Sequence, residues 1–231
     1  MRKQGGFTLI EIAIVLVIIG LLLGGVLKGQ ELITSARVRN LISQQDGIKA
    51  AYFGFLDRFR ALPGDYTQAS INISCTPACT NGNGNGQIQT AAAGGAGAID
   101  EHIAVWEHLS KAGFVNGSFS YAVVPETATS AAANPYVRYV RVIYDTAYGT
   151  GTGSIRHNVK TGNQIPSDIM AEIDRKIDDG NPVGGNLQFS TYDGGGTGGT
   201  PPTGGAVGQC YNGTTWSSAT VVTNCGGASL L

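Results

Sequence analysis

A carboxylate inside an apolar run is the first feature of this sequence that could do chemistry. From Phe7 to Leu27 there are 21 residues, and Glu11 is the only charged one. At about 1.5 Å per residue, a helix of this length spans roughly 30 Å, the thickness of the hydrocarbon core of a bilayer. A carboxylate in lipid costs on the order of 2 kcal/mol or more, so we expect Glu11 to have a partner and a function.

Cleavage of the chain after Gly6 would supply that partner. Gly5 and Gly6 directly precede the apolar run, whereas a secretory signal has its cleavage site after the run. The cut would create an amine on Phe7, and an amine about 4 Å from a carboxylate gains on the order of 4 kcal/mol at an effective dielectric constant near 20. The amine could belong to the same chain or to a neighbouring subunit, in which case Glu11 would set the register of helix assembly. The alternative is that Glu11 only marks the interfacial edge of the helix.

Four cysteines form two local groups, Cys75 with Cys79 and Cys210 with Cys225. Four cysteines allow three pairings, and disulfides are the default in a domain outside the cytoplasm. We expect each group to pair internally. Closing a loop of about 15 residues contributes about 3 kcal/mol in the chain-entropy model. A four-cysteine zinc site is the alternative, but the spacings are poor for zinc.

An alternating run of Asn and Gly could bind a cation or form tight turns. The anionic ligands of a calcium loop are missing from it, and its twelfth position is Ala92 instead of Glu. We favour a tight turn stapled by a Cys75–Cys79 disulfide, with calcium as the alternative, and predict no other metal or cofactor. The residues that echo a calcium loop are Asn81, Asn83, Asn85, Gly86 and Ile88. Charge could come from outside the run, from Asp65, Asp100 or Glu101.

The rest of the sequence offers no catalytic constellation. His102, His108 and His157 lack the spacing of a helical metalloprotease site, and there is neither a nucleophile elbow nor a phosphate loop. A formal net charge of −1 gives no footprint for nucleic acid. With 35 glycines and only 13% charged residues, the composition fits a loop-rich exported protein better than a cytosolic enzyme. We therefore predict that the protein is not an enzyme.

A long helix must carry the apolar run, because the helical pattern continues beyond it. Apolar residues recur at steps of 3, 4 or 7, with charged and amide residues largely between them. Pro63 and Gly64 end this pattern, so one helix is predicted from Phe7 to about Ala61. Its first half would lie in a membrane or filament core, and its second half would pack on a globular domain. The apolar face consists of Leu41, Ile48, Tyr52, Phe55, Phe59 and Leu62.

Two short helices and several strands are predicted in the globular part. One helix runs from Asp100 to Lys111 with Gly113 as its stop; another is capped by Ser167 and stopped by Gly180. "SFSYAVV" (118–124) and "PYVRYVRVIYD" (135–145) are predicted to be strands. The predicted inward residues are Ile103, Trp106 and Leu109 in the first helix and Ile169, Ile173 and Ile177 in the second. The last segment is interpreted as one or two strands closed by a disulfide, and contains Cys210, Trp216 and Cys225.

Two charged groups in this part have alternative interpretations. Arg138 and Arg141, with nearby tyrosines, could bind an anionic polymer in an adhesin or DNA-binding subunit, but cross-strand pairs on a half-exposed sheet are favoured. Asp178 and Asp179 are interpreted as part of a solvated loop, and a helix-end or calcium-loop acid pair is the alternative.

The stretch "GGFTLIEIAIVLVIIG" closely resembles the type IV prepilin signal of type IV pilins and type II secretion pseudopilins. The likeness comprises Gly6 before the cut, Phe7 as first mature residue, Glu11 as the fifth, and the apolar run, within about the first 30 residues. It implies that a prepilin peptidase cleaves after Gly6 and methylates the new amine. It also implies that mature helices bundle into a filament core, where the glutamate meets a neighbour's N-terminus.

The sequence departs from the pilin pattern at Lys28. Many pilins have a proline there, about 22 residues into the mature chain, where the helix kinks or melts on assembly. Each helical glycine weakens a helix by about 1 kcal/mol relative to alanine, so glycines could soften this helix instead, or they could be ordinary transmembrane glycines. The glycines concerned are Gly20, Gly24, Gly25 and Gly29.

These observations predict a pilin-like α+β fold, with a long N-terminal helix packed on an antiparallel sheet. The expected parts are a leader (1–6), a transmembrane and assembly helix (7–28), its amphipathic continuation (29–62) and a head domain (63–231). The predicted function is that of a pilin or minor pilin that assembles with like subunits. A type II secretion pseudopilin is the close alternative, and a membrane-anchored periplasmic binding module or adhesin the alternative of another class. The expected location is the inner membrane, with a cytoplasmic N-terminus and a periplasmic head, and later a filament.

Overall fold

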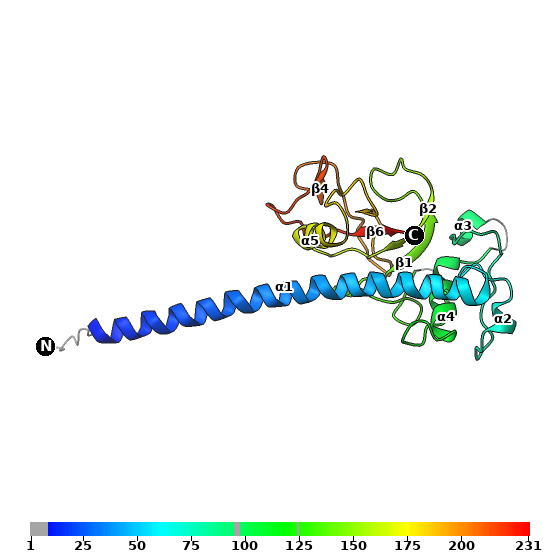
Figure 1. The fold of residues 1–231 in the computed structure, drawn as a ribbon, viewed down its shortest axis with the longest axis horizontal. Helices are drawn as coiled ribbons and strands as arrows, with labels where there is room; N and C mark the ends of the chain where they lie inside the picture. Colours follow the sequence, from blue (N-terminus) through cyan, green and yellow to red (C-terminus); the bar gives the residue numbers. More distant parts are fainter. Residues whose placement is uncertain (1–8, 95–97, 124) are drawn as a thin grey trace. The chain divides into compact units, whose positions relative to one another are not determined.

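The computed structural model describes residues 9–94, 98–123 and 125–231 (Figure 1). The chain divides into two compact units, one ending at Val38 and one formed by Arg39–Leu231. The second unit contains both the end of the long helix and the predicted head domain. The predicted limits of the leader, assembly helix and head at residues 6, 28 and 62 stay predictions.

The predicted long helix is present as α1, Leu9–Phe59. It contains no proline, and it ends where Arg60 adopts a left-handed φ of 54°, two residues before the predicted end. Within the second unit, the predicted apolar face is buried, with Phe59 and Leu62 partly so. The fully buried members of this face are Leu41, Ile48, Tyr52 and Phe55.

An antiparallel sheet of four strands forms the centre of the head, in the order β1-β2-β6-β3. Its strands are β1 (Arg141–Asp145), β2 (Arg156–Lys160), β3 (Leu187–Phe189) and β6 (Gly227–Leu230). The late strand β6 lies between β2 and β3, with Ser229 opposite Val159 on one side and Leu187 on the other. Together with α1, this sheet confirms the predicted α+β fold.

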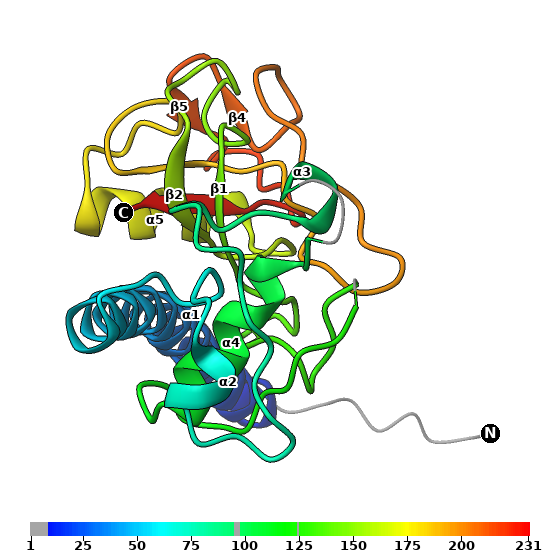
Figure 2. The same cartoon turned by 90° about the vertical axis from the view of Figure 1, so that its right-hand side faces the viewer.

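Helix α4 (Glu101–Lys111) joins α1 to the sheet, and Figure 2 shows it beside the end of α1. The prediction for this helix is confirmed: it follows Asp100, and Gly113 comes after it with a φ of +83°. Its three predicted inward residues have no exposed surface. Trp106 and Leu109 share one core cluster with Phe55 of α1 and with Val142 of β1. The remaining short elements are α2 (Ala69–Asn72), α3 (Ala91–Gly94), α5 (Ser167–Ile177), β4 (Tyr211–Asn212) and β5 (Thr215–Trp216).

Helix α5 has the predicted position, but two of its residues differ from expectation. Pro166 occupies the cap position, and the Ser167 hydroxyl, predicted to cap the helix, donates to the carbonyl of Ser217 at 2.6 Å. Ile169 and Ile173 are buried as predicted, whereas Ile177 in the last turn is 37% exposed. The long-range bond explains the first difference, because it directs the hydroxyl away from the helix N-terminus.

The predicted strand over 118–124 is wrong for residues 118–123, and residue 124 lies outside the described part. Side chains of α4 take the place of a partner strand here. The backbone N–H of Tyr121 donates to the Glu107 carboxylate at 3.0 Å, and that of Phe119 to Ser110 Oγ at 3.2 Å. An alternating pattern cannot reveal that the ladder partner is a helix side chain.

The predicted strand over 135–145 begins only at Arg141. The Asn134 side chain accepts hydrogen bonds from the N–H groups of Tyr136, at 2.8 Å, and Arg138, at 3.0 Å. Val137 between them has a left-handed φ of 61° and is 81% exposed. An asparagine that bonds its own backbone competes with strand formation, so residues 135–140 turn before the chain enters the sheet.

Candidate functional site

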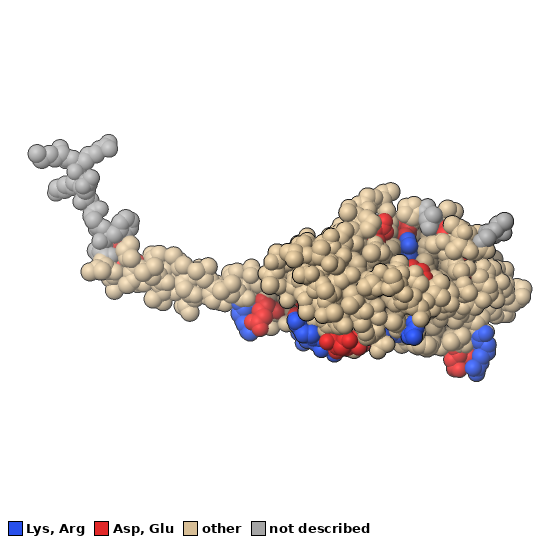
Figure 3. Space-filling model, turned by 90° about the horizontal axis from the view of Figure 1, so that it is seen from above, with Lys and Arg blue, Asp and Glu red and all other residues tan. Residues whose placement is uncertain are grey.

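The N-terminal part of α1 is an apolar helix without a covering surface in the structure. Its large apolar side chains up to Leu27 are exposed, from 45% at Ile19 to 93% at Leu9. Figure 3 shows the visible face of this part as almost entirely uncharged. Among the described residues, α1 is the one helix long and apolar enough to cross a membrane, with a mean hydropathy of 2.8 over its best window.

Glu11 lies in the first turn of α1, between exposed Ile10 and Ile12. Its carboxylate is therefore carried by the same apolar surface that any membrane or helix partner would contact. Gly6 and Phe7 lie outside the described residues, so the predicted cleavage and the pairing of Glu11 with the Phe7 amine stay predictions.

The helical glycines leave gaps in this surface. A Cβ built at Gly20 or Gly24, one turn apart, would meet no atom within 4 Å beyond the adjacent helix backbone, and the same holds for Gly25 and Gly29. Small residues one turn apart let a second helix approach closely in a membrane. Lys28, at the predicted departure from the pilin pattern, is helical and pairs with Glu31 at 2.7 Å.

The Asn-Gly run folds around carboxylates that lie outside it. The Asp65 carboxylate accepts the N–H groups of Gly84 at 2.6 Å, Asn85 at 3.1 Å and Gly86 at 2.8 Å. Glu101 of α4 accepts those of Asn83 at 3.0 Å and Gln89 at 3.1 Å. Asp65 and Glu101 thus place negative charge beside the run from outside it, as the sequence suggested. In the structure their carboxylates accept hydrogen bonds from backbone N–H groups of the run.

The pKa of Glu101 is raised in this arrangement. Burial raises the pKa of Glu101 to about 7; Asp65 adds to the rise, and the N–H donors of Asn83 and Gln89 oppose it. The three asparagines proposed for calcium use their side-chain oxygens in hydrogen bonds: Asn81 accepts from Ser70 N at 2.8 Å, Asn83 from Asn85 N at 2.9 Å and Asn85 from Gln87 N at 2.8 Å. Calcium at these residues stays a prediction.

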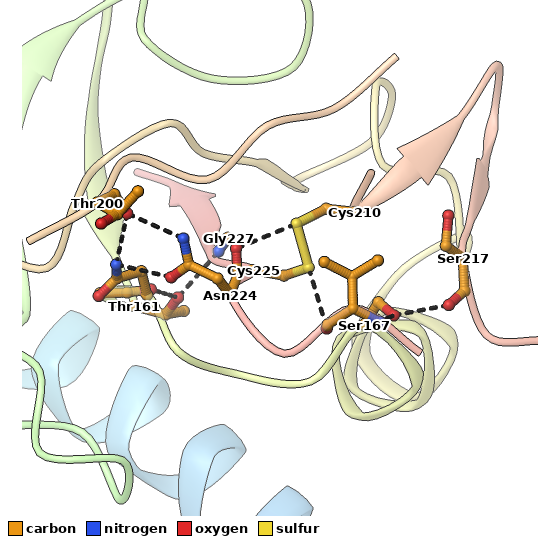
Figure 4. Close-up of a disulfide and its surroundings, with 11 residues drawn as sticks. Thr161, Ser167, Thr200, Cys210, Ser217, Asn224, Cys225 and Gly227 are labelled. Atoms are coloured by element: carbon orange, nitrogen blue, oxygen red, sulfur yellow. Dashed lines mark hydrogen bonds between the residues drawn. A yellow bond between two sulfur atoms is a disulfide. The ribbon is translucent and has the colours of Figure 1, made fainter. Parts of the chain in front are cut away.

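The two disulfides of the structure pair Cys75 with Cys79 and Cys210 with Cys225. Figure 4 shows the second, with polar side chains that hold its loop to the head. Thr161 N and Gly227 O are 2.8 Å apart, and Gly227 N donates to Thr161 Oγ1 at 2.9 Å. The backbone of Cys225 also pairs with Ile165 in an isolated antiparallel bridge. The segment 210–227 is therefore bonded to the end of β2 and to the start of α5. One or two strands were predicted in the last segment, and the structure has three: β4 and β5 between the two cysteines, and β6 after Cys225.

The three histidines have separate structural partners. Gly64 N donates to His108 Nδ1 at 2.9 Å, and the other ring nitrogen lies 2.7 Å from the Thr80 carbonyl. Ile88 N donates to His157 Nε2 at 3.3 Å. Burial lowers the pKa of both rings. His102 Nε2 lies 3.6 Å from the Glu126 carboxylate, a buried acid that sequence reasoning missed because nothing in its flanking residues distinguishes it.

Arg138 and Arg141 do not form the joint binding face considered from the sequence. Arg141 is bound to buried Glu126, with its side chain 20% exposed. Arg138 instead lines a polar cleft of about 530 Å³ with Asn163, Gln164 and residues of the glycine-rich loop. The two arginines therefore have different surroundings in the head: Arg141 pairs with a buried acid, and Arg138 lines the cleft.

Comparison with known protein families identifies a motif in the N-terminal segment. A model of the prokaryotic N-terminal methylation motif matches residues 1–27. No curated protein and no solved structure matches the chain. The chain thus carries the signal of a type IV pilin- or pseudopilin-type precursor. That signal, with the exposed apolar helix, is typical of a structural subunit and compatible with membrane anchoring.

Proposed function

We propose that the chain is the precursor of a pilin-like structural subunit. A prepilin peptidase cleaves it after Gly6, and the mature subunit assembles through its N-terminal helix into a type IV pilus or related filament, as a pilin or minor pilin. The carrying observation is that the methylation motif at residues 1–27 runs into a helix whose apolar side chains are exposed.

The physical basis is the transfer of this helix from lipid to other helices. Before assembly the apolar segment spans the inner membrane, with a cytoplasmic N-terminus and the head on the periplasmic side. In a filament the same surface packs on neighbouring helices, and Gly20, Gly24, Gly25 and Gly29 allow close approach. Glu11 then pairs with the Phe7 amine of a neighbouring subunit, and this pair of opposite charges in an apolar medium fixes the axial register of the two helices.

The intact mass and N-terminal sequence of the protein from its own cells test processing. We expect a chain that begins with N-methylated Phe7. Retention of residues 1–6 in the mature pool would overturn the proposal and favour the alternative, a periplasmic binding module or adhesin with an uncleaved anchor. In that case, changing Gly6 or Glu11 would leave the function of the head unaffected.

Filament imaging separates the two members of the proposed class. A type IV pilin is expected in filaments on the cell surface, and a type II secretion pseudopilin in a short periplasmic assembly. Immunogold labelling of the head on cells with intact and with permeabilised outer membranes distinguishes these locations, and labelling of surface filaments is the result expected here.

A further inference from the structure

Five Asn-Gly dipeptides in the chain could undergo a reaction between neighbouring residues. The backbone nitrogen of the glycine can attack the side-chain carbonyl carbon of the asparagine before it, because glycine has no Cβ to hinder the approach. The reaction depends on whether the folded chain lets these two atoms reach a near-attack geometry. The asparagines concerned are Asn81, Asn83, Asn85, Asn116 and Asn212.

The three glycine nitrogens of the Asn-Gly run are all engaged as donors. Gly82 N donates to the carbonyl of Tyr66 at 3.0 Å, and the nitrogens of Gly84 and Gly86 donate to the Asp65 carboxylate at 2.6 and 2.8 Å. An attacking nitrogen must lose its proton, and a hydrogen bond to a carboxylate holds that proton strongly. The charge of Asp65 also opposes the negative charge that would develop on the nitrogen. The run is therefore protected, although its asparagines are exposed.

Asn212 is protected by a different constraint. It lies in β4 and pairs with Thr215 of β5 in a two-stranded hairpin, where Thr215 Oγ1 also donates to its carbonyl at 3.1 Å. To close a ring, the backbone of the asparagine must rotate until the next nitrogen faces its own side chain. That rotation would break the pairing with Thr215, so the hairpin opposes the reaction.

Asn116 and Gly117 are free of both constraints. They lie in the loop that follows α4, outside any helix or strand, and both are exposed. Within the described part of the chain, neither Gly117 N nor the Asn116 side chain makes a hydrogen bond. The two reacting atoms can therefore approach each other without the loss of an existing contact.

The charges beside this loop favour the reaction. Lys111 Nζ donates to Ser118 Oγ at 2.9 Å, and Arg58 Nη1 donates to the carbonyl of Ala112 at 3.3 Å. Positive charge near the Gly117 nitrogen stabilises the anion that forms when this nitrogen loses its proton. Solvent reduces the size of the effect but not its sign, which is opposite to that of Asp65 at the Asn-Gly run.

We propose that Asn116 is a site of spontaneous deamidation in the folded protein, from which the other four Asn-Gly dipeptides are protected. Gly117 N gives its proton to hydroxide and forms a bond to Asn116 Cγ. The Cγ–Nδ2 bond breaks, and the nitrogen leaves as ammonia after taking a proton from water. Water then opens the five-membered imide at either carbonyl, which leaves aspartate or isoaspartate at position 116.

The modification would change the surface beside α1. Asn116 lines a groove of about 340 Å³ together with Gln44 and Gly47 of α1 and Trp106 of α4. Either product places a new carboxylate at this groove, and isoaspartate also lengthens the backbone of the loop by one methylene. Older molecules would therefore differ from new ones by one negative charge on this face of the head.

Peptide mapping of the full-length protein tests this proposal. The protein is purified in detergent, incubated at mildly alkaline pH and sampled over days, and each sample is reduced, digested with trypsin and measured by mass spectrometry. Trypsin separates the sites, because position 116 falls in the peptide 112–138, the Asn-Gly run in 61–111 and position 212 in 177–231. We expect the acid product in 112–138, as two chromatographic forms, to appear about tenfold or more faster than in the other two peptides. Ion exchange of the undigested protein should show a more acidic form that grows at the same rate.

The unfolded chain and two variants are the controls. In urea, all five dipeptides should react at similar rates, which would show that the fold causes the selectivity. Asn116→Gln should remove the product from 112–138, because a glutamine would have to close a six-membered ring, which is slower. Asp65→Asn should speed the reaction in 61–111 and leave that in 112–138 unchanged.

Equal rates per dipeptide in the folded protein would overturn the proposal. So would a 112–138 peptide that stays intact while the unfolded chain reacts, or a product in this peptide that persists in Asn116→Gln. An unchanged rate for 61–111 in Asp65→Asn would overturn the protection assigned to Asp65.

Discussion

Arg141 and Glu126 form a buried ion pair in which Nε and Nη2 of the arginine each lie 2.5 Å from the same carboxylate oxygen. Glu126 is 1% exposed, and the Tyr192 hydroxyl donates to that oxygen at 3.0 Å. The guanidinium also lies 4.1 Å from the centre of the Tyr192 ring. The arginine that the sequence offered to an anionic polymer therefore neutralises a buried acid and braces the glycine-rich loop that follows Tyr192.

Removing Arg141 should destabilise the head strongly. Arg141→Ala leaves Glu126 charged and buried, and breaking a buried pair in this way costs about 3–5 kcal/mol. Urea unfolding monitored by tryptophan fluorescence measures the loss. Arg138→Ala, three residues away and outside the pair, should cost within about 1 kcal/mol. Equal losses in the two variants would contradict the structural role of the pair.

Acid should destabilise the protein through His102. Burial, the largest cause, and Arg141 lower the pKa of His102 to about 4, although Glu126 and Asp100 oppose this. Because the unfolded ring has a pKa near 6.5, the unfolded state binds the proton first. Stability from His102 is complete above about pH 6.5 and falls by roughly 3 kcal/mol as the pH approaches 4.

A variant without His102 separates the pH effect of His102 from that of Glu101. The raised pKa of Glu101, about 7, acts in the opposite direction, because its contribution to stability is lost as the pH rises. Unfolding free energies of wild type and His102→Phe should be compared from pH 7 to pH 4. The wild type should lose more stability on acidification than the variant. Parallel pH profiles would show that His102 does not couple to folding.

Asp65 should organise the Asn-Gly run. In Asp65→Asn, an amide N–H₂ replaces one acceptor of three backbone N–H groups, so we expect a loss of about 2–3 kcal/mol in the free energy of unfolding. Amide hydrogen exchange should show faster exchange at Gly84, Asn85 and Gly86. Asp57→Asn is the control, since Asp57 is 82% exposed and its ion pair is with exposed Arg60; it should change neither quantity.

The two disulfides should differ in their contribution to the free energy of unfolding. Replacing Cys210 and Cys225 by alanine opens a loop with a sequence separation of 15 and should cost about 3 kcal/mol or more, whereas replacing Cys75 and Cys79 opens one of 4 and should cost about 2 kcal/mol or less. Thermal unfolding under oxidising conditions ranks the two double variants. The reverse order would mean that the short loop braces more of the head than its closure entropy indicates.

Glu11→Gln tests the proposed role of the carboxylate in assembly. The amide keeps the size and removes the charge, so membrane insertion and cleavage after Gly6 should survive while filament yield falls. Membrane fractionation, N-terminal sequencing and quantification of sheared filaments measure the three steps. Normal yield from correctly processed Glu11→Gln would remove the charge-pair argument.

Local patterns in the sequence were sufficient to predict the three long helices, α1, α4 and α5, but not the one-turn helices α2 and α3. The apolar face with Ile48, Tyr52 and Phe55 predicted α1, and Ile103, Trp106 and Leu109 predicted α4, because burial on one side of a helix leaves a periodic record. The same reasoning failed for residues 118–123 and 135–140, where some backbone N–H groups bond to side chains instead of a neighbouring strand. These are the N–H groups of Phe119, Tyr121, Tyr136 and Arg138. It also missed the Glu126 pair, because that pair depends on contacts between residues far apart in the chain.

The position of β6 between β2 and β3 has a consequence for biogenesis. β6 is made after all other strands of the head, so until it arrives β2 keeps one open edge and β3 has no partner in the sheet. Unpaired edges invite pairing with other chains. The nascent head is therefore exposed to misassembly for the whole interval between the synthesis of Phe189 and that of Leu230, and a chaperone that shields the free edge of β2 would act at that stage.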